Sequence, residues 1–183
     1  MEGMAQQEPG GRINPLRIIG WSFAVFIFLL PLVAMRFTDE VDWNGADFIF
    51  AGILLGGSGL LFELVARKSA NNAYRAGAAA AIANAFLLVW ITGAVGVIGK
   101  EGDPANLFLV GVILLAFAGA AVVRFRPAGM AAVMACCAAA TALIGGFGLT
   151  VDFKGGVLTW GFAGVWLLSA GLFRLAARFP AQD

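Results

Sequence analysis

The chain has 183 residues, of which 61% are hydrophobic and 13% are charged, and its formal net charge is +1. Soluble globular domains carry about 25% charged residues, and a single core of this size cannot bury so much apolar surface, so a soluble fold is excluded. The small net charge gives no reason to expect a nucleic acid as a partner. The chain has no histidine, which removes the most common metal ligand and excludes haem held by two histidines of this chain.

Six apolar runs are long enough to cross a bilayer, because a hydrocarbon core of about 30 Å takes about 20 helical residues. The gaps between them are short and hold nearly all the charge, so successive helices should be antiparallel neighbours. We therefore predict an all-α transmembrane bundle over residues 16–178, with a disordered tail at 1–15 and a short tail at 179–183. The predicted spans are residues 16–35, 47–65, 74–98, 104–123, 128–150 and 157–176.

The first of these spans is predicted to be a permanent anchor. It is longer than the apolar core of a secretory signal peptide, and residues 31–35 make a poor cleavage site.

Basic residues gather on one side of the predicted bundle. Lysine and arginine are retained in the cytoplasm during insertion, which predicts that this side and both termini are cytoplasmic. Seven of the 11 acidic residues fall on the opposite side. The nine basic residues on the predicted inner side, of 12 in all, are Arg12, Arg17, Arg67, Lys68, Arg75, Arg124, Arg126, Arg174 and Arg178.

The second and sixth spans resemble one another, which suggests a helical hairpin used three times in the same orientation. Ser58 and the segment 61–67 match Ser169 and the segment 172–178 at most positions. The alternative is a chance match between two helices rich in glycine, alanine and leucine.

Small residues predict where the helices approach one another, because helices in lipid associate through close backbone contact. Gly52 and Gly56 form one such pair, and Gly77 with Ala81 begins another. The alanine-rich inner halves of the third and fifth spans should lie in the centre of the bundle.

The connection between the first two spans is strongly acidic. A hard cation such as Ca²⁺ takes about six oxygen ligands, and this segment could supply several, although it lacks the spacing of a known calcium loop. The alternative is a solvated loop in which the last carboxylate caps the second helix. The four acidic residues are Asp39, Glu40, Asp42 and Asp47.

The connection after the third span adds Glu101, Asp103 and Asn106 to the same predicted outer face. Asp103 followed by proline is typical of a helix start. Capping does not account for Asn106, which lies one turn into the next span. The two connections together could form one polar site on the outer face, as an alternative to solvated and helix-capping carboxylates.

Few polar or reactive side chains lie within the apolar runs. An intramembrane Glu63 is a functional candidate, with a proton relay as one reading. Arg67 follows it in the favourable order for a structural ion pair, which is the other reading. We expect Asn84 to form a hydrogen bond to a neighbouring helix rather than to a substrate. Cys136 and Cys137 are adjacent, which favours two small buried hydrophobic residues over a redox or metal pair.

Several segments resemble a family of small bacterial six-span membrane proteins. The resemblance covers about residues 16–178, and it implies a bacterial envelope location and a six-span bundle but no activity and no site. The segments that carry it are 37–41 with Trp43 and residues 47–48, 94–99 with Glu101, 104–107, 124–127, and 129–130.

No spacing typical of a catalytic, cofactor or metal motif occurs. We therefore expect a non-enzymatic protein of the bacterial inner membrane without a cofactor, acting as an accessory or scaffold subunit that packs in the bilayer against another membrane protein or a second copy. The alternative is a small transporter or channel whose acidic outer vestibule concentrates cations. An intramembrane enzyme is disfavoured, because acid–base catalysis needs paired groups at depth.

Overall fold

The computed structural model describes residues 15–100 and 102–179, and within these ranges it contains six α-helices and no strand. The helices have between 19 and 26 residues, or about 29–39 Å at 1.5 Å per residue, and are apolar enough to cross a core of about 30 Å. The expected all-α class is confirmed, and the protein is a multi-pass membrane protein. The helices are α1 (Pro15–Ala34), α2 (Gly45–Lys68), α3 (Asn72–Ala94), α4 (Pro104–Val122), α5 (Pro127–Val151) and α6 (Phe153–Arg178).

The ends of the helices differ from the predicted spans by four residues in two places and by three or fewer elsewhere. Helix α3 stops at Ala94 rather than at residue 98, because Gly96 takes a left-handed conformation with φ of +76°. A Cβ at this position would lie 2.8 Å from the carbonyl oxygen of Lys100, so only glycine fits the turn. Helix α6 begins at Phe153, four residues earlier than predicted. Of the predicted tails at 1–15 and 179–183, Pro15 begins α1 and Phe179 follows α6, while residues 1–14 and 180–183 lie outside the described residues.

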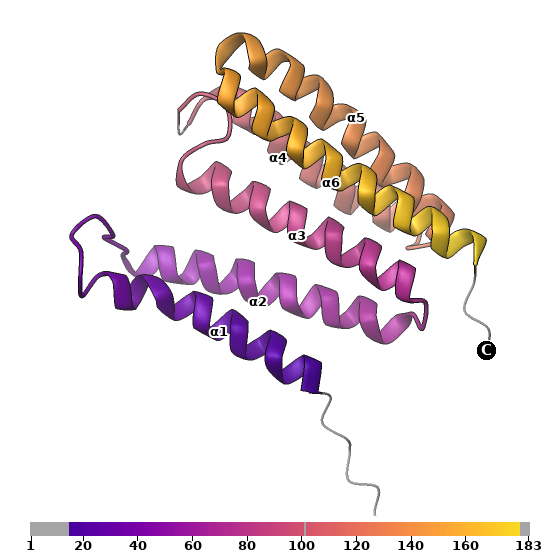
Figure 1. The fold of residues 1–183 in the computed structure, drawn as a ribbon, viewed down its shortest axis with the longest axis horizontal. Coiled ribbons are helices and arrows are strands. Elements are labelled where there is room, and N and C mark those ends of the chain that lie inside the picture. The colour runs from indigo at the N-terminus through magenta and orange to yellow at the C-terminus, as the bar shows by residue number, and fades with distance from the viewer. Residues whose placement is uncertain (1–14, 101, 180–183) are drawn as a thin grey trace, which may run out of the picture. The chain divides into compact units, whose positions relative to one another are not determined.

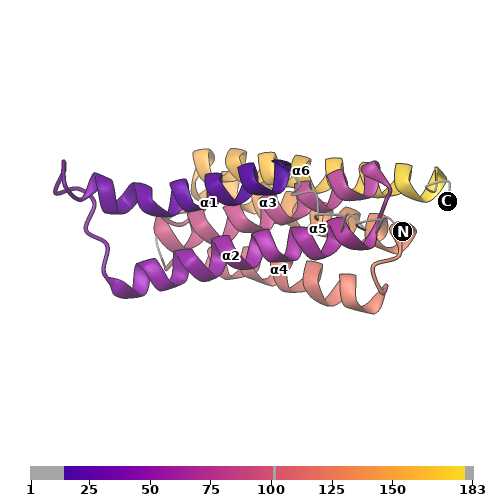
Figure 2. The same ribbon diagram turned by 90° about the horizontal axis from the view of Figure 1, so that it is seen from below.

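The chain divides into two compact units, Met1–Gly59 and Leu60–Asp183. In the first unit, α1 and the first part of α2 run antiparallel (Figures 1 and 2). A Cβ on Gly52 would lie 3.5 Å from the ring of Phe28, and one on Gly59 would lie 3.3 Å from the ring of Trp21. These two glycines leave room on α2 for the aromatic rings of α1.

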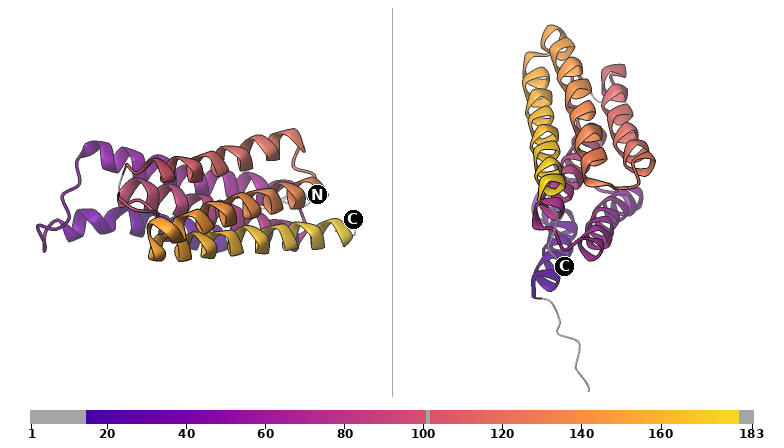
Figure 3. Two further views of the ribbon diagram at one scale, coloured as in Figure 1. Left: turned by 90° about the horizontal axis from the view of Figure 1, so that it is seen from above. Right: turned by 90° about the vertical axis from the view of Figure 1, so that its right-hand side faces the viewer.

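The second unit packs α3, α4, α5 and α6 together (Figure 3). Helix α6 packs most extensively against α5 and also against α3, while α4 packs against α5. Several large side chains are fully buried in this unit: Leu88, Leu109, Met134, Trp166 and Phe173.

The predicted central position of the alanine-rich helix halves is confirmed for one face of α3, whose other face exposes Ala76 and Ala83, and is wrong for one face of α5. Gly77 and Ala78 of α3 are buried, and a Cβ on Gly77 would lie 3.3 Å from the Cβ of Leu172 in α6. In α5, by contrast, Ala132 and Ala135 are exposed. Within the second unit the central helix is α6, which buries both small residues and the large Phe162, Trp166 and Phe173 where it meets its neighbours.

Hydrogen bonds between connections define two ends of the second unit. At one end, the Asn71 side chain donates to the carbonyl of Phe179 at 2.7 Å, and the Tyr74 hydroxyl donates to the carbonyl of Phe125 at 2.8 Å. At the other end, the Gly99 amide donates to Asp152 at 3.3 Å.

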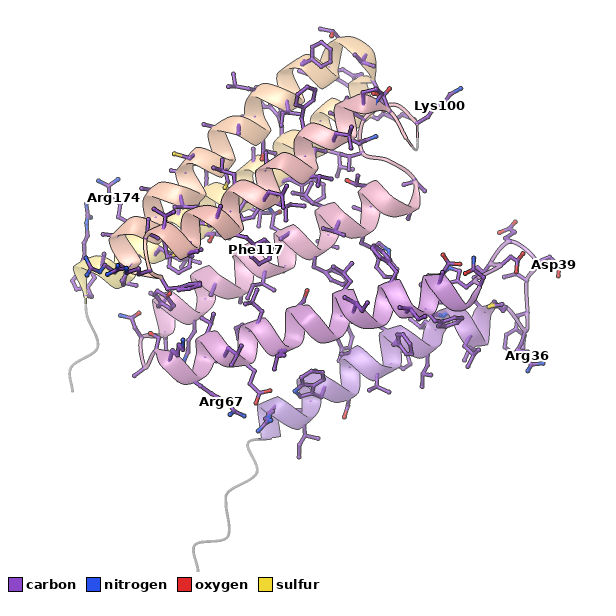
Figure 4. The ribbon with its side chains drawn as sticks, turned by 180° about the vertical axis from the view of Figure 1, so that it is seen from behind. Arg36, Asp39, Arg67, Lys100, Phe117 and Arg174 are labelled. Atoms are coloured by element: carbon purple, nitrogen blue, oxygen red, sulfur yellow. The ribbon has the colours of Figure 1, made fainter. Side chains whose placement is uncertain are left out.

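Charge is distributed unequally between these two ends. Arg174 and Lys100 mark them in Figure 4. The first, which we call the basic end, carries Arg67, Lys68, Arg75, Arg124, Arg126, Arg174 and Arg178. The opposite end carries Lys100, Lys154, Asp103 and Asp152 among its described residues.

Candidate functional site

Asn106 is the most extensively hydrogen-bonded of the predicted site residues. It lies in the first turn of α4 and is 4% exposed. Its Oδ1 accepts from the amides of Val97 at 2.9 Å and Ile98 at 3.0 Å. Its Nδ2 donates to the carbonyls of Ile98 at 3.1 Å and Lys100 at 3.2 Å. A carboxamide has two donors and two acceptor positions, so all of them are used to hold the α3–α4 connection.

At the end of the second unit opposite the basic end, the two described carboxylates, Asp103 and Asp152, cap helices. Asp103 accepts from the Ala105 amide at 2.8 Å and begins α4 as predicted. Asp152 accepts from the Lys154 amide at 3.1 Å and begins α6, while its other oxygen accepts the bond from Gly99. Both carboxylates therefore have structural roles. Glu101, the third acidic residue predicted for this site, lies outside the described residues.

The acidic connection between α1 and α2 is solvated. Asp39, Glu40 and Asp42 are exposed. Asp47 accepts from the Asn44 amide at 2.8 Å, while the Asn44 side chain accepts from the Ala46 amide at 2.7 Å, so Asp47 helps to cap α2 as predicted. In the described parts of the chain, no three acidic or cysteine side chains lie close enough together to hold a metal ion.

The polar side chains predicted within the spans make the expected contacts. Glu63 and Arg67 form an ion pair at 2.7 Å between consecutive turns of α2. The Asn84 side chain, 2% exposed, donates to the carbonyl of Phe162 at 3.2 Å and thus joins α3 to α6. Neither Asn84 nor Glu63 therefore needs a substrate to account for its position.

A second bond between α3 and α6 was not predicted. The buried Ser169 hydroxyl donates to the carbonyl of Gly77 at 2.8 Å. A hydroxyl on an apolar helix opposite a glycine is the signal that could have identified it, because only glycine leaves its carbonyl so accessible. Trp166, which is 1% exposed, was also missed, and its Nε1 has no hydrogen-bond partner among the described residues.

The two cysteines differ in their surroundings. Cys137 is fully buried, whereas Cys136 is exposed, so the expectation of two buried residues is wrong for Cys136. Consecutive residues of an α-helix point about 100° apart, so Cys137 can face the interior of the unit while Cys136 points outward.

One face of α6 carries three exposed glycines and two exposed leucines, and we call it the glycine face. It comprises Gly161, Gly164, Leu168, Gly171 and Leu175, all of which are exposed. A Cβ added to any of its three glycines would meet no other atom of residues 15–100 and 102–179 within 4 Å. The packing of the second unit therefore does not require glycine at these positions.

A groove lies between α5 and α6 at the basic end, and we call it the α5–α6 groove. Its volume is about 610 Å³, within the range of about 300–1,000 Å³ typical of ligand pockets. Its walls are mostly alanine, and two arginines of α6 lie at its end. The lining residues are Ala128, Ala131, Ala132, Ala135, Leu167, Ala170, Gly171, Arg174, Ala177 and Arg178.

Comparisons of the chain with protein-family models, with curated proteins and with solved structures find no match. The resemblance to small six-span bacterial proteins therefore stays a prediction. The glycine face and the α5–α6 groove are the two surface features from which a function can be inferred.

Proposed function

We propose that the protein is a non-catalytic accessory or scaffold subunit that binds another membrane protein through the glycine face of α6. The exposure of Gly161, Gly164 and Gly171 along one side of a transmembrane helix carries this proposal. Glycine in a helix interior costs about 1 kcal/mol relative to alanine, so three glycines that pack against nothing among the described residues of the second unit are costly unless a partner uses them.

The physics of helix association in lipid supports this choice of surface. Lipid tails are as apolar as leucine, so helices gain little from burying large apolar side chains against one another. They gain from close backbone approach, which glycine permits. Leu168 and Leu175 lie beside the glycines and would pack along the sides of a partner helix seated on this face.

The bonding of the polar side chains supports a role without catalysis. Asn84 and Ser169 both bond to backbone carbonyls of neighbouring helices, and Glu63 is paired with Arg67. A general acid and base would need groups with open positions facing a substrate, and these three groups are engaged.

We further propose that the protein lies in the bacterial cytoplasmic membrane with its basic end and both termini in the cytoplasm. The concentration of arginine at the basic end supports this orientation, since positively charged connections are retained in the cytoplasm during insertion.

The experiment is affinity purification from native membranes in a mild detergent, followed by mass spectrometry. We expect Gly161→Leu with Gly164→Leu to lower recovery of the partner by about tenfold or more, a change of about 1.4 kcal/mol in binding. The matched control is Gly111→Leu with Gly146→Leu, two glycines of α4 and α5 that also have open space around them. Recovery of the wild-type chain as a lone monodisperse monomer, or equal losses in both variants, contradicts the proposal.

A further inference from the structure

The α5–α6 groove has the length of one bilayer leaflet. The part of α6 between Leu167 and Arg178 rises about 16 Å at 1.5 Å per residue. The hydrocarbon core of a bilayer is about 30 Å thick, so the groove extends from the basic end to about the middle of the membrane. It therefore parallels the full path of one acyl chain.

The walls of the groove are apolar and shallow. Ala128, Ala132 and Ala135 are exposed and follow one another on one side of α5, where larger side chains would fill the space. An unfilled hollow would deprive these walls of van der Waals contact, so it takes up an apolar chain from its surroundings. In a bilayer, the available apolar chains are the tails of lipids.

Charge is present only at the headgroup end of the groove. Arg174 and Arg178 are one helical turn apart and both are exposed, and no ion pair joins either to a carboxylate within residues 15–100 and 102–179. Figure 4 shows Arg174 at the basic end. Two guanidinium groups on one face can bind a phosphate through several charge-assisted hydrogen bonds.

We propose that the α5–α6 groove binds one anionic phospholipid, with the phosphate between Arg174 and Arg178 and an acyl chain along the alanines of α5. Basic pockets between transmembrane helices are suited to such headgroups. Charge at one end of the groove and apolar walls along the rest match the headgroup and the acyl chain of a single lipid. This lipid site is independent of the glycine face, with which it shares Gly171 alone.

Native mass spectrometry of the purified full-length chain tests the site, with phosphatidylglycerol and chain-matched phosphatidylcholine as probes. We expect one phosphatidylglycerol to bind more tightly than phosphatidylcholine. Arg174→Gln with Arg178→Gln should reduce that preference by about thirtyfold, because each basic residue near the headgroups is worth roughly a factor of five. The matched control is Arg124→Gln with Arg126→Gln, two exposed arginines of the same end that do not line the groove.

A second pair of variants tests the path of the acyl chain. Ala132→Leu with Ala135→Leu fills the groove from exposed positions and should abolish the tight site. Ala118→Leu with Ala121→Leu places the same added volume on exposed positions of α4 and should leave it intact. Circular dichroism in detergent verifies that all variants remain helical.

Four results would overturn the proposal. They are equal binding of the two lipids, equal losses in the groove variants and their controls, competition by inorganic phosphate alone, and a dimer that the groove-filling variant dissociates. The first two remove the site, the third assigns it to a soluble anion, and the fourth assigns the groove to a second copy of the chain.

Discussion

At the scale of single residues, the side-chain carboxamide of Asn106 holds the α3–α4 connection in shape. Asn106→Ala would leave the buried amides of Val97 and Ile98 without their partner and would remove the bond to the carbonyl of Ile98. Each unsatisfied buried group costs about 1–3 kcal/mol, so we expect the variant to lose about 2–4 kcal/mol of stability after partial relaxation. Thermal or denaturant unfolding in detergent measures this loss.

Asn72→Ala is the matched control for this prediction, because Asn72 is an exposed asparagine at the start of α3. It should change stability by less than about 0.5 kcal/mol. Hydrogen exchange adds a local measurement: the amides of Val97 and Ile98 should lose protection in the Asn106 variant only. Unchanged protection of these two amides would refute the role of the Asn106 side chain in holding the α3–α4 connection.

The two buried asparagines differ in how far sequence alone could assign them. Asn84 was predicted to bond across to another helix, since any polar group at that depth must find a partner among its neighbours. The partners of Asn106 are backbone atoms of a connection whose shape depends on Gly96 and Gly99 at positive φ. Local sequence indicates that this segment turns but does not show that it folds around the first turn of α4.

At the scale of the elements, the α5–α6 hairpin depends on contact between backbones. A Cβ on Gly156 would lie 2.5 Å from the amide nitrogen of Leu149, and one on Gly145 would collide with the ring of Trp160. Gly156→Ala must therefore push the two helices apart, at a cost of about 1–3 kcal/mol. The reference is Gly161→Ala on the same helix, where nothing lies within 4 Å.

The two alanine variants should thus shift stability in opposite directions. Gly161→Ala adds helix propensity without a clash and should be neutral or stabilising by up to about 1 kcal/mol. Unfolding midpoints of the two proteins in one detergent compare them directly. If Gly156→Ala were as stable as Gly161→Ala, the close approach of α5 and α6 would be wrong.

Sequence predicted the helices well and their contacts only in part. Six apolar runs between charged connections specify six spans, because a bilayer imposes a fixed length. Which faces meet depends on small residues, and these occur on every helix. The pairs Gly145-Gly146 and Gly155-Gly156, placed on either side of the turn at Asp152, were the available signal for the closest hairpin. The predicted threefold repeat of hairpins stays a prediction, since α3 and α4 make far less contact than α5 and α6.

At the scale of the whole molecule, the distribution of charge predicts how the chain is inserted. In a variant without Cys136 and Cys137, single cysteines can be placed at exposed positions of either end. We expect a membrane-impermeant maleimide to label Lys100→Cys and Lys154→Cys in intact cells. Arg126→Cys and Arg178→Cys should react with the maleimide only after the membrane is permeabilised.

The physical reason is the cost of transferring arginines across the membrane. Each arginine or lysine at the centre of a helix costs about 2.5–3.5 kcal/mol on the insertion scale, and the basic end carries many more of them than the opposite end. The orientation that leaves them in the cytoplasm is therefore favoured at every connection. A reporter fused after Asp183 gives an independent measurement and should be active only as a cytoplasmic fusion. Labelling of Arg126→Cys in intact cells, together with a periplasmic reporter, would invert the topology and move the proposed lipid site to the outer leaflet.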